Sequence, residues 1–292
     1  MQLMEQVKLT EQINSMKYEE LYRYGVQQLK CAAIEEADLD ARLLLEDVCH
    51  TNRNDLLVHG MNEVSEEQKG SYVNHIERRC AHTPLQYIIG YQEFMGLRFK
   101  VTSNVLIPRQ DTETLVEEVL RYLHDGMRIL DVCTGSGCIL LSLLHYSNNC
   151  VGTGTDLSEN ALAVAKENAT ALGLEAIFLQ GDLFENISEK YDIIVSNPPY
   201  IPSEVIPTLM EEVKFHDPLM ALDGGQDGLS FYKKITSQAG AYLYHGGRLF
   251  FEIGWNQAED VSQYMKDAGF NEVVVYRDLG GLDRVVSGIY GG

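Results

Sequence analysis

Three features are missing from this sequence of 292 residues, and each absence excludes a class of protein. There is no run of about 18 apolar residues, which is the length that a membrane-spanning helix needs. There is no surplus of basic residues either: 43 aspartates and glutamates outnumber 23 lysines and arginines, for a net charge of −20. Such a chain repels polyanions over most of its surface, so we expect neither a membrane protein nor a dedicated nucleic-acid binder.

The third absence is a close pair of cysteines. The six cysteines include no Cys-x-x-Cys pair, and Cys133 and Cys138 have no second pair or nearby histidine to complete a zinc site. We therefore expect no metal site, and reduced, mostly buried thiols as in a cytosolic protein. The first eight residues have neither a basic start nor an apolar stretch, which argues against a secretory signal and favours the cytoplasm.

The length predicts two domains, at about 150 residues each. Residues 1–82 are expected to form a small helical domain, because apolar residues recur at helical spacing in Tyr18–Lys30 and Asp40–Cys49. Ser65 and Gln68 form a capping-box pattern that predicts a third helix ending near Cys80. In residues 83–108 the sequence pattern changes from helical spacing to short β-prone runs. The runs 85–91 and 97–101 predict a β-hairpin linker.

Residues 109–292 alternate between strand and helix patterns, which predicts a Rossmann-like α/β domain with a mostly parallel sheet of seven strands. The expected strands are Arg128–Val132, Val151–Thr155, Ala176–Leu179, Asp192–Ser196, Arg248–Ile253, Glu272–Tyr276 and Arg284–Ile289. A helix is expected at Glu159–Leu172, and the closeness of the last two strands predicts an antiparallel finish. Ligands of such folds bind beyond the carboxyl ends of the strands.

The first strand of this domain runs into an acid and a glycine turn. The residues concerned are Asp131, Cys133, Thr134, Gly135, Ser136 and Gly137. The two glycines allow the backbone to pass close to a ligand before the next helix begins, although the turn lacks the full Gly-x-Gly-x-x-Gly of dinucleotide binders. Asp131 either accepts a hydrogen bond from a ligand amine or orders the turn.

Two further acids follow neighbouring strands. Asp156 ends the second strand, nineteen residues after Gly137, where a carboxylate can accept from both hydroxyls of a ribose. Ser158 is suited to cap the helix that follows. After the third strand, Asp182 is a candidate for binding an adenine amino group and Leu183 for covering the ring. The alternative for Asp182 is an aspartate that caps a turn.

The fourth strand runs directly into Asn197, Pro198, Pro199 and Tyr200. The prolines fix the backbone and remove two N–H donors, which leaves the Asn197 side-chain oxygen and the Pro198 carbonyl as acceptors beside an aromatic ring. Two acceptors and a ring suit a planar NH₂ group, with Tyr200 stacked on its plane. The alternative is a rigid proline turn, but its place at the end of the fourth strand favours a site.

These motifs resemble methyltransferases that use S-adenosylmethionine and act on planar nitrogens. More narrowly, the chain resembles the PrmC/HemK family of peptide chain release factor N5-glutamine methyltransferases. The resemblance runs through segments 84–90, 106–113, 195–202, 221–229, 251–254 and 283–286. Asn-Pro-Pro-Tyr by itself is shared with adenine-N6 methyltransferases, whereas segment 108–113 and the helical N-terminal domain are more specific.

The resemblance implies that residues 133–137 bind the methionine part of the cofactor, and that Asp156 binds the ribose with Leu183 beside the adenine. It implies that residues 197–200 bind the glutamine amide of the release factor's Gly-Gly-Gln motif, with Asn197 touching both cofactor and substrate. The sequence departs from the family pattern at Cys133, which replaces a glycine, at Gln110, which replaces a proline, and at Leu183, often an aromatic residue. Cys133 fits the loop if its φ is negative, and we do not expect it to be reactive.

The expected chemistry is alignment of a weak nucleophile, with Asn197 and Pro198 accepting the amide hydrogens and no general base needed before transfer. Arg109, Asp111 and Glu113 form either an ion cluster that fixes the interdomain loop or a contact with the partner. Residues 216–217 are expected in a solvated turn, and Gly224, Gly225 and Gly228 in a tight turn.

Two rival functions remain open. An adenine-N6 nucleic-acid methyltransferase shares the fold, the cofactor and the Asn-Pro-Pro-Tyr motif, but the net charge of −20 and the lack of a basic recognition domain count against it. An inactive cofactor-binding scaffold is the second, and the intact segment 197–200 counts against that. We expect the partner to be a release factor, which docks a basic patch partly on the helical domain.

Overall fold

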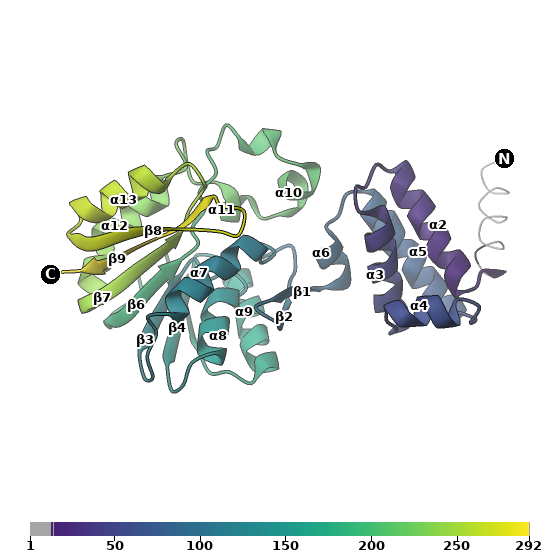
Figure 1. Cartoon of the computed structure of the whole chain (residues 1–292), viewed down its shortest axis with the longest axis horizontal. Helices are drawn as coiled ribbons and strands as arrows, with labels where there is room; N and C mark the ends of the chain where they lie inside the picture. Colours follow the sequence, from purple (N-terminus) through teal and green to yellow (C-terminus); the bar gives the residue numbers. More distant parts are fainter. Residues whose placement is uncertain (1–12, 14, 292) are drawn as a thin grey trace. The chain divides into compact units, whose positions relative to one another are not determined.

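The chain divides into two compact units, Met1–Gly90 and Tyr91–Gly292, in a computed structural model that describes Ile13 and Ser15–Gly291 (Figure 1). The N-terminal stretch considered above for a secretory signal lies outside the described residues. The first unit is helical, as predicted. Its helices are α2 (Tyr18–Cys31), α3 (Ala37–Cys49), α4 (Arg53–His59), α5 (Glu66–Cys80) and α6 (Leu85–Ile89).

Local sequence explains where the helices of the first unit begin and how they pack. Ser65 caps α5 as predicted: its Oγ accepts from the Gln68 amide at 3.2 Å, and the Gln68 Oε1 accepts from the Ser65 amide at 3.2 Å. Leu21, Leu44 and Tyr72 are fully buried between α2, α3 and α5. Helix α4 was not predicted, because it has no buried residues and so shows no apolar periodicity.

The expectation of a strand at residues 85–91 is wrong for most of that run. Residues Leu85–Ile89 form helix α6, which starts after Pro84 and ends at Gly90 with a left-handed φ of 84°. Leu85 and Ile88, three positions apart, share one face and are buried in the core of the helical unit. Burial of that face overrides the β-propensity of the Tyr-Ile-Ile sequence. The hairpin starts only afterwards, with β1 (Tyr91–Phe94) and β2 (Leu97–Lys100).

The second unit contains the seven predicted strands in one sheet of order β5-β4-β3-β6-β7-β9-β8 (Figure 1). The strands are β3 (Arg128–Val132), β4 (Val151–Asp156), β5 (Ile177–Gln180), β6 (Tyr191–Ser196), β7 (Leu243–Glu252), β8 (Phe270–Arg277) and β9 (Asp283–Tyr290). All neighbours are parallel except β9, which runs antiparallel to both β7 and β8. The predicted fold class and its antiparallel finish are confirmed.

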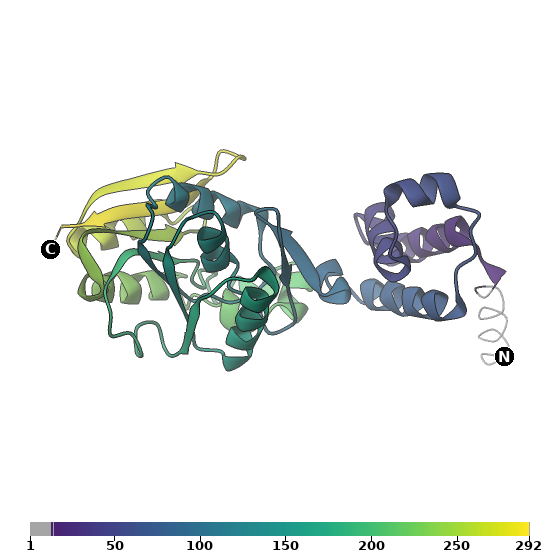
Figure 2. The same cartoon turned by 90° about the horizontal axis from the view of Figure 1, so that it is seen from below.

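Helices cover both faces of this sheet (Figure 2). They are α7 (Gln110–Leu120), α8 (Cys138–His145), α9 (Glu159–Leu172), α10 (Glu211–His216), α11 (Leu219–Leu222), α12 (Ser230–Tyr242) and α13 (Ala258–Asp267), with a short 3₁₀ turn at Ile206–Thr208. Alternate residues of one strand serve the two faces: Ile129 packs in the core with α7 and α8, and Leu130 in the core with α12 and α13. With both faces covered, the carboxyl ends of the strands are left for a site.

Among the described residues, no helix combines the length and the apolar character that crossing a bilayer requires.

Candidate active site

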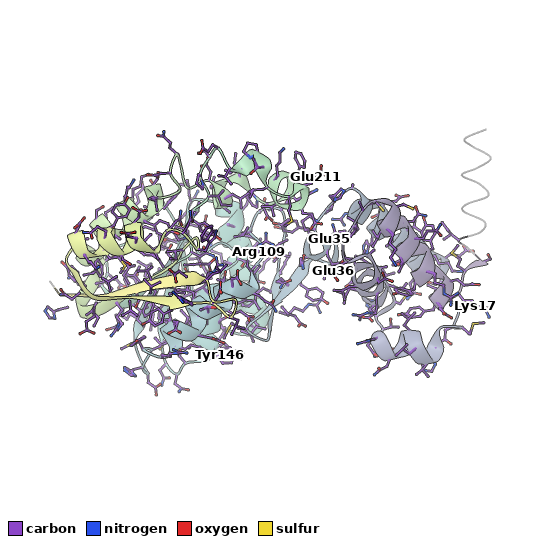
Figure 3. All side chains as sticks on the ribbon, turned by 45° about the horizontal axis from the view of Figure 1, so that its top comes forward. Lys17, Glu35, Glu36, Arg109, Tyr146 and Glu211 are labelled. Atoms are coloured by element: carbon purple, nitrogen blue, oxygen red, sulfur yellow. The ribbon has the colours of Figure 1, made fainter. Side chains whose placement is uncertain are left out.

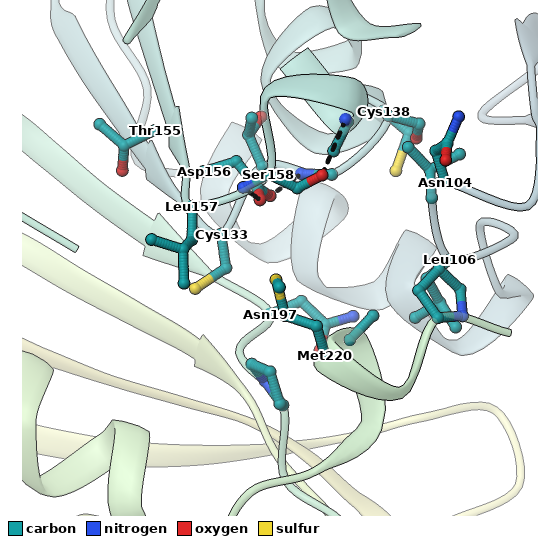
Figure 4. A pocket seen from close by; sticks show the side chains of 18 of the residues that line it. Asn104, Leu106, Cys133, Cys138, Thr155, Asp156, Leu157, Ser158, Asn197 and Met220 are labelled. Carbon is teal, nitrogen blue, oxygen red and sulfur yellow. Dashed lines mark hydrogen bonds between the residues drawn. The ribbon is translucent and has the colours of Figure 1, made fainter. Parts of the chain in front are cut away.

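A cavity of about 240 Å³ lies at the carboxyl ends of β3, β4, β5 and β6, all within the second unit (Figure 4). The predicted site residues that line it are Cys133, Thr134, Gly135, Ser136, Asp156, Asp182, Leu183, Asn197 and Pro199. The predicted site residues that do not line it are Asp131, Gly137, Pro198 and Tyr200. The fold therefore brings together the ends of four strands that are far apart in the sequence.

Asp131, at the penultimate position of β3, orders the glycine turn. Its side chain is fully buried, and its Oδ2 accepts a hydrogen bond of 2.6 Å from the Thr134 hydroxyl. Burial raises the pKa of Asp131 to about 7, although the Thr134 hydrogen bond opposes that rise. Of the two roles considered for this residue, the observed bond is the turn-ordering one.

Cys133 does not have the negative φ on which its fit was expected to depend; its φ is +64°. A side chain in this left-handed region costs about 1–2 kcal/mol, which is why a glycine is the usual solution there. The same region recurs at Gly135 and Gly137, with φ values of 56° and 79°. Burial raises the pKa of the Cys133 thiol above its usual range, so the thiol stays protonated at neutral pH.

Asp156 ties the end of β4 to the glycine turn. Its Oδ2 accepts from the Gly135 amide at 2.9 Å, and its Oδ1 accepts from the Ser158 amide at 2.9 Å. Burial raises its pKa, while these backbone bonds work against the rise. Ser158 is the helix cap predicted, since its Oγ accepts from the Ala161 amide at 3.1 Å. Each carboxylate oxygen keeps a further acceptor site for a ligand hydroxyl.

Asp182 and Leu183 follow β5 and also line the cavity. Asp182 is exposed and stands in a turn in which its amide donates to Glu185 Oε2 at 3.1 Å. Leu183 is 6% exposed and, like Cys133, has a left-handed φ, here 54°. The side chain of Leu183 thus forms an apolar wall of the cavity and joins the core against β3 and β6.

The chemistry of this half of the cavity fits S-adenosylmethionine. A Cβ added at Gly135 would meet no atom within 4 Å, so the turn leaves open space over its backbone. A carboxylate at the end of β4 suits a ribose, and the apolar side chains of Leu183 and Phe231 suit an adenine. The residues present therefore provide an acid, an open backbone turn and an apolar wall for the three parts of such a cofactor.

Asn197 follows β6 directly and is half-buried at the wall of the cavity, close to Cys133 and Met220 in Figure 4. Its Nδ2 donates to the Thr112 hydroxyl at 3.4 Å. Tyr200 packs instead against the core beside α12, where burial raises its pKa to about 12, so its phenol stays protonated. Stacking of Tyr200 on a substrate amide stays a prediction.

The backbone of residues 199–201 is held by the glycine-rich segment that precedes α12. Gln257 Nε2 donates to the Tyr200 carbonyl at 3.0 Å, and Ile201 forms a parallel bridge with Asp223. A Cβ at Gly228 would lie 2.3 Å from the Tyr200 carbonyl oxygen, so this close approach requires glycine. The predicted tight turn is thus also a clamp on the Asn-Pro-Pro-Tyr segment.

The acids and the arginine around the start of α7 do not form one ion cluster. Arg109, labelled in Figure 3, bonds Asp217 at 2.6 Å, whereas Asp111 pairs with Arg284 at 3.1 Å. Glu113 accepts from the Met95 amide at 2.6 Å. The expectation of a solvated turn at residues 216–217 is wrong for Asp217, whose side chain is 1% exposed because it faces Arg109.

Sequence reasoning missed two polar side chains beside Asn197. They are Thr112, in the first turn of α7, and Glu252, the last residue of β7; both are 2% exposed. Both fall within motifs quoted for the family resemblance; for Glu252 the available signal was a polar residue at the end of a predicted strand, whereas Thr112 in helix α7 gave no such signal. In Ile13 and Ser15–Gly291, no group of three or more His, Cys, Asp or Glu side chains is placed to hold a metal ion.

Comparison with known proteins first defines the class. Residues 20–90 match a family described as the PrmC N-terminal domain, and residues 109–213 match the methyltransferase small domain. A solved methyltransferase from Pyrococcus furiosus shares the fold with a TM-score of 0.53 at 15% identity, over 78% of this chain and 100% of that one. Fold and domain match together define a methyltransferase.

Curated relatives narrow this class. A release factor glutamine methyltransferase of Caulobacter vibrioides is 41% identical over 267 residues, which is 90% of this chain and 92% of the relative. One from Clostridium acetobutylicum is 42% identical over 260 residues, which is 87% of this chain and 91% of the relative. The chain belongs to the release factor glutamine methyltransferases.

Proposed function

We propose that this protein transfers a methyl group from S-adenosylmethionine to the side-chain amide nitrogen, N5, of the glutamine in the Gly-Gly-Gln motif of peptide chain release factors. The observation that carries the proposal is the place of Asn197, which follows β6 and lines the same cavity as Asp156 and the turn after β3. The activity named for the relatives supports the choice of substrate.

The amide is a weak nucleophile, and the task of the chain is to hold it. S-adenosylmethionine supplies a methyl group that is already activated on a sulfonium, so the residues act mainly by orientation. We assign the two hydrogens of the substrate NH₂ to Asn197 Oδ1 and the Pro198 carbonyl, with Pro199 and Tyr200 completing the substrate site. These hydrogens become more acidic as the nitrogen attacks, so fixed acceptors stabilise the developing positive charge, and one of the two protons then leaves to water.

The cofactor roles follow from the same cavity. In this proposal residues 133–137 hold the methionine part, Asp156 accepts from the ribose hydroxyls, and Leu183 covers the adenine, whose amino group faces Asp182. Asp131 acts through the turn that it orders and not by contact with the ligand. Asn197 stands where cofactor and substrate meet.

The partner in this proposal is a release factor, and the helical unit supplies part of its docking surface. The net charge of −20 favours a basic patch on the partner and an association that weakens as salt rises. Because release factors act on ribosomes, the reaction belongs to the cytoplasm. We expect no direct nucleic-acid binding.

The experiment is a methylation assay with purified release factor, labelled S-adenosylmethionine and a double-stranded DNA control. The expected result is label in the release factor alone, located by mass spectrometry of its tryptic peptides on the glutamine of Gly-Gly-Gln. Label on adenine in the DNA would instead establish the alternative, an adenine-N6 methyltransferase. Label in neither would favour an inactive cofactor-binding scaffold.

A further inference from the structure

Beside Asn197 lies a chain of polar side chains that joins three elements of the second unit; of these, Thr112 and Asn197 line the cavity and Glu252 does not. Ser196 of β6 pairs in register with Phe251 of β7, so Asn197 and Glu252 come next at the carboxyl ends of neighbouring strands. Asn197 Nδ2 donates to Thr112 Oγ1 at 3.4 Å, and the proximity of the Thr112 and Asn197 side chains, as hydrogen-bond donors, works to lower the pKa of the Glu252 carboxylate. The three side chains thus form one connected network.

The carboxylate in this network is an expensive group to bury. Glu252 is 2% exposed, and its Oε2 has no hydrogen-bond partner within the part of the chain that the structure describes. Burial raises the pKa of Glu252 to about 7, against the opposing effects of the Thr112 bond and the Arg284 charge. Arg284 stays close by, because its Nη1 donates to the Ile253 carbonyl at 3.4 Å and its Nη2 pairs with Asp111 at 3.1 Å. Because burying a carboxylate destabilises the folded protein, we expect a functional role for Glu252.

The chemistry of the asparagine side chain suggests that role. A carboxamide has an oxygen that only accepts and a nitrogen that only donates, and the two ends have almost the same shape. In its ionised form, which predominates above pH 7, the Glu252 carboxylate has no hydrogen to give, so the Thr112 hydroxyl donates to Glu252 and can only accept from Asn197. Thr112 and Glu252 therefore engage the Asn197 nitrogen, which leaves its oxygen free to accept from a ligand in the cavity that Asn197 lines.

We propose that Glu252 and Thr112 are positioning residues that hold the Asn197 amide in the orientation presenting its oxygen to the substrate. The inference rests on the proposed function, since it gives Asn197 the task of accepting from the substrate NH₂. If the Asn197 amide were flipped, its Nδ2 hydrogens would face the hydrogens of the substrate NH₂, and that group would lose its acceptor. Neither Glu252 nor Thr112 needs to touch the reacting atoms.

The test uses a matched pair of variants in the full-length protein. Thr112→Val keeps the shape of the side chain but removes the hydroxyl, whereas Thr112→Ser keeps the hydroxyl. We expect Thr112→Val to lower kcat for release factor methylation about 10- to 100-fold, the usual effect of losing a hydrogen bond to a charged network. KM for the release factor, calorimetric cofactor affinity and Tm should change little, and Thr112→Ser should stay within about threefold of the wild-type kcat.

Glu252→Gln gives a second test that does not depend on the folding of the Thr112 variants. We expect a similar loss in kcat, because the introduced amide can donate to Thr112 and reverse the direction of the chain. The kcat of the double variant Thr112→Val/Glu252→Gln should be no lower than that of the less active single variant, since both substitutions remove the same constraint. If the two substitutions instead caused independent packing defects, their fold-losses in kcat would multiply.

A wild-type-like kcat for Glu252→Gln or for Thr112→Val would overturn the inference. Equal losses for Thr112→Val and Thr112→Ser, or losses that track Tm and cofactor affinity, would overturn it as well, because they indicate a merely structural role. These results differ from failure of the proposed function, in which the wild-type protein itself leaves the release factor unmethylated.

Discussion

The two ends of the cavity are built in different ways. The end at β3, β4 and β5 is shaped mainly by backbone: left-handed φ values at Cys133, Gly135 and Leu183, with backbone amides held by the Asp156 carboxylate. The end at β6 has a backbone fixed by prolines, and its Asn197 side chain is joined to Thr112 and, on the neighbouring strand β7, to Glu252. The first end is determined by backbone conformation, and the second by which side chains donate and which accept hydrogen bonds.

This difference explains where the sequence tolerates change. At the first end, Cys133 and Leu183 carry side chains at left-handed φ values, yet the turn and its bond to Asp156 are formed, because a backbone path accepts several side chains at a cost. At the second end, an acceptor cannot be exchanged for a donor without leaving a group unpaired. Substitutions at the two ends should therefore separate cofactor binding from methyl transfer.

The largest effect is expected at Asn197. Asn197→Ala should lower methyl transfer by about 10²–10³-fold, the usual cost of removing one fixed polar group that faces developing charge. Cofactor affinity measured by calorimetry should stay within about threefold. The control is Asn160→Ala, which removes an exposed asparagine of α9 that does not line the cavity and should leave both quantities nearly unchanged. Equal losses of transfer and cofactor binding in Asn197→Ala would contradict the division into two ends.

The reverse pattern is expected at Asp156. Asp156→Ala removes acceptors of the ribose and of the Gly135 and Ser158 amides, so cofactor Kd should rise about 10- to 100-fold. With saturating cofactor, most of the wild-type kcat should return. A variant that binds cofactor normally would show that Asp156 holds the turn and nothing more.

Gly228→Ala should damage the amide end through the backbone. Its Cβ would lie 2.3 Å from the Tyr200 carbonyl oxygen, so segment 197–200 must shift, and we expect kcat to fall about tenfold or more at nearly constant cofactor affinity. Gly173→Ala is the matched control: that glycine also has a left-handed φ, 67°, but its Cβ would meet no atom within 4 Å. Equal kcat values in the two variants would exclude the clamp.

The pH dependence of stability should reveal the raised pKa of the Asp131 carboxyl in the folded protein. Its pKa in the folded protein, about 7, lies above the ordinary value of 3.8, so the folded state binds the proton more tightly between these values and loses stability as pH rises through them. Asp131→Asn does not titrate. Relative to wild type it should therefore gain up to about 1.4 kcal/mol per pH unit between pH 5 and 7. Urea unfolding at several pH values measures this, and a constant difference would contradict it.

The smallest effect is expected at Cys133. Cys133→Gly removes left-handed strain of about 1–2 kcal/mol at an entropic cost of about 0.5–1 kcal/mol. A net gain of about 0.5–1 kcal/mol should raise Tm by about 1–3 °C in calorimetry. Cys133→Ala keeps a Cβ at the same φ and should not show the gain. If both variants raise Tm alike, the thiol rather than the backbone is responsible.

Much of the fold could be predicted from the sequence because its signals are local. Five of the seven strands (β3, β4, β6, β7 and β9) contain runs of buried residues, and Ser65 and Ser158 cap helices through residues three positions away. The prediction failed at residues 85–89, where a short apolar run suits either a strand or a helix and tertiary burial decides.

The site was only partly predictable. Residues that follow strand ends were found, because parallel strands bring their carboxyl ends to one edge. The sign of φ at Cys133 was not, since it depends on how the turn meets β4. The network of Thr112, Asn197 and Glu252 joins three elements far apart in the chain, and its hydrogen bonds appear only once they are packed together.

The most direct measurement is a crystal structure of the protein with S-adenosylhomocysteine and a peptide containing Gly-Gly-Gln. We expect the glutamine NH₂ within hydrogen-bond distance of Asn197 Oδ1 and the Pro198 carbonyl, with its nitrogen facing the cofactor sulfur. A glutamine bound elsewhere, or Asn197 directing its nitrogen at the peptide, would contradict the account.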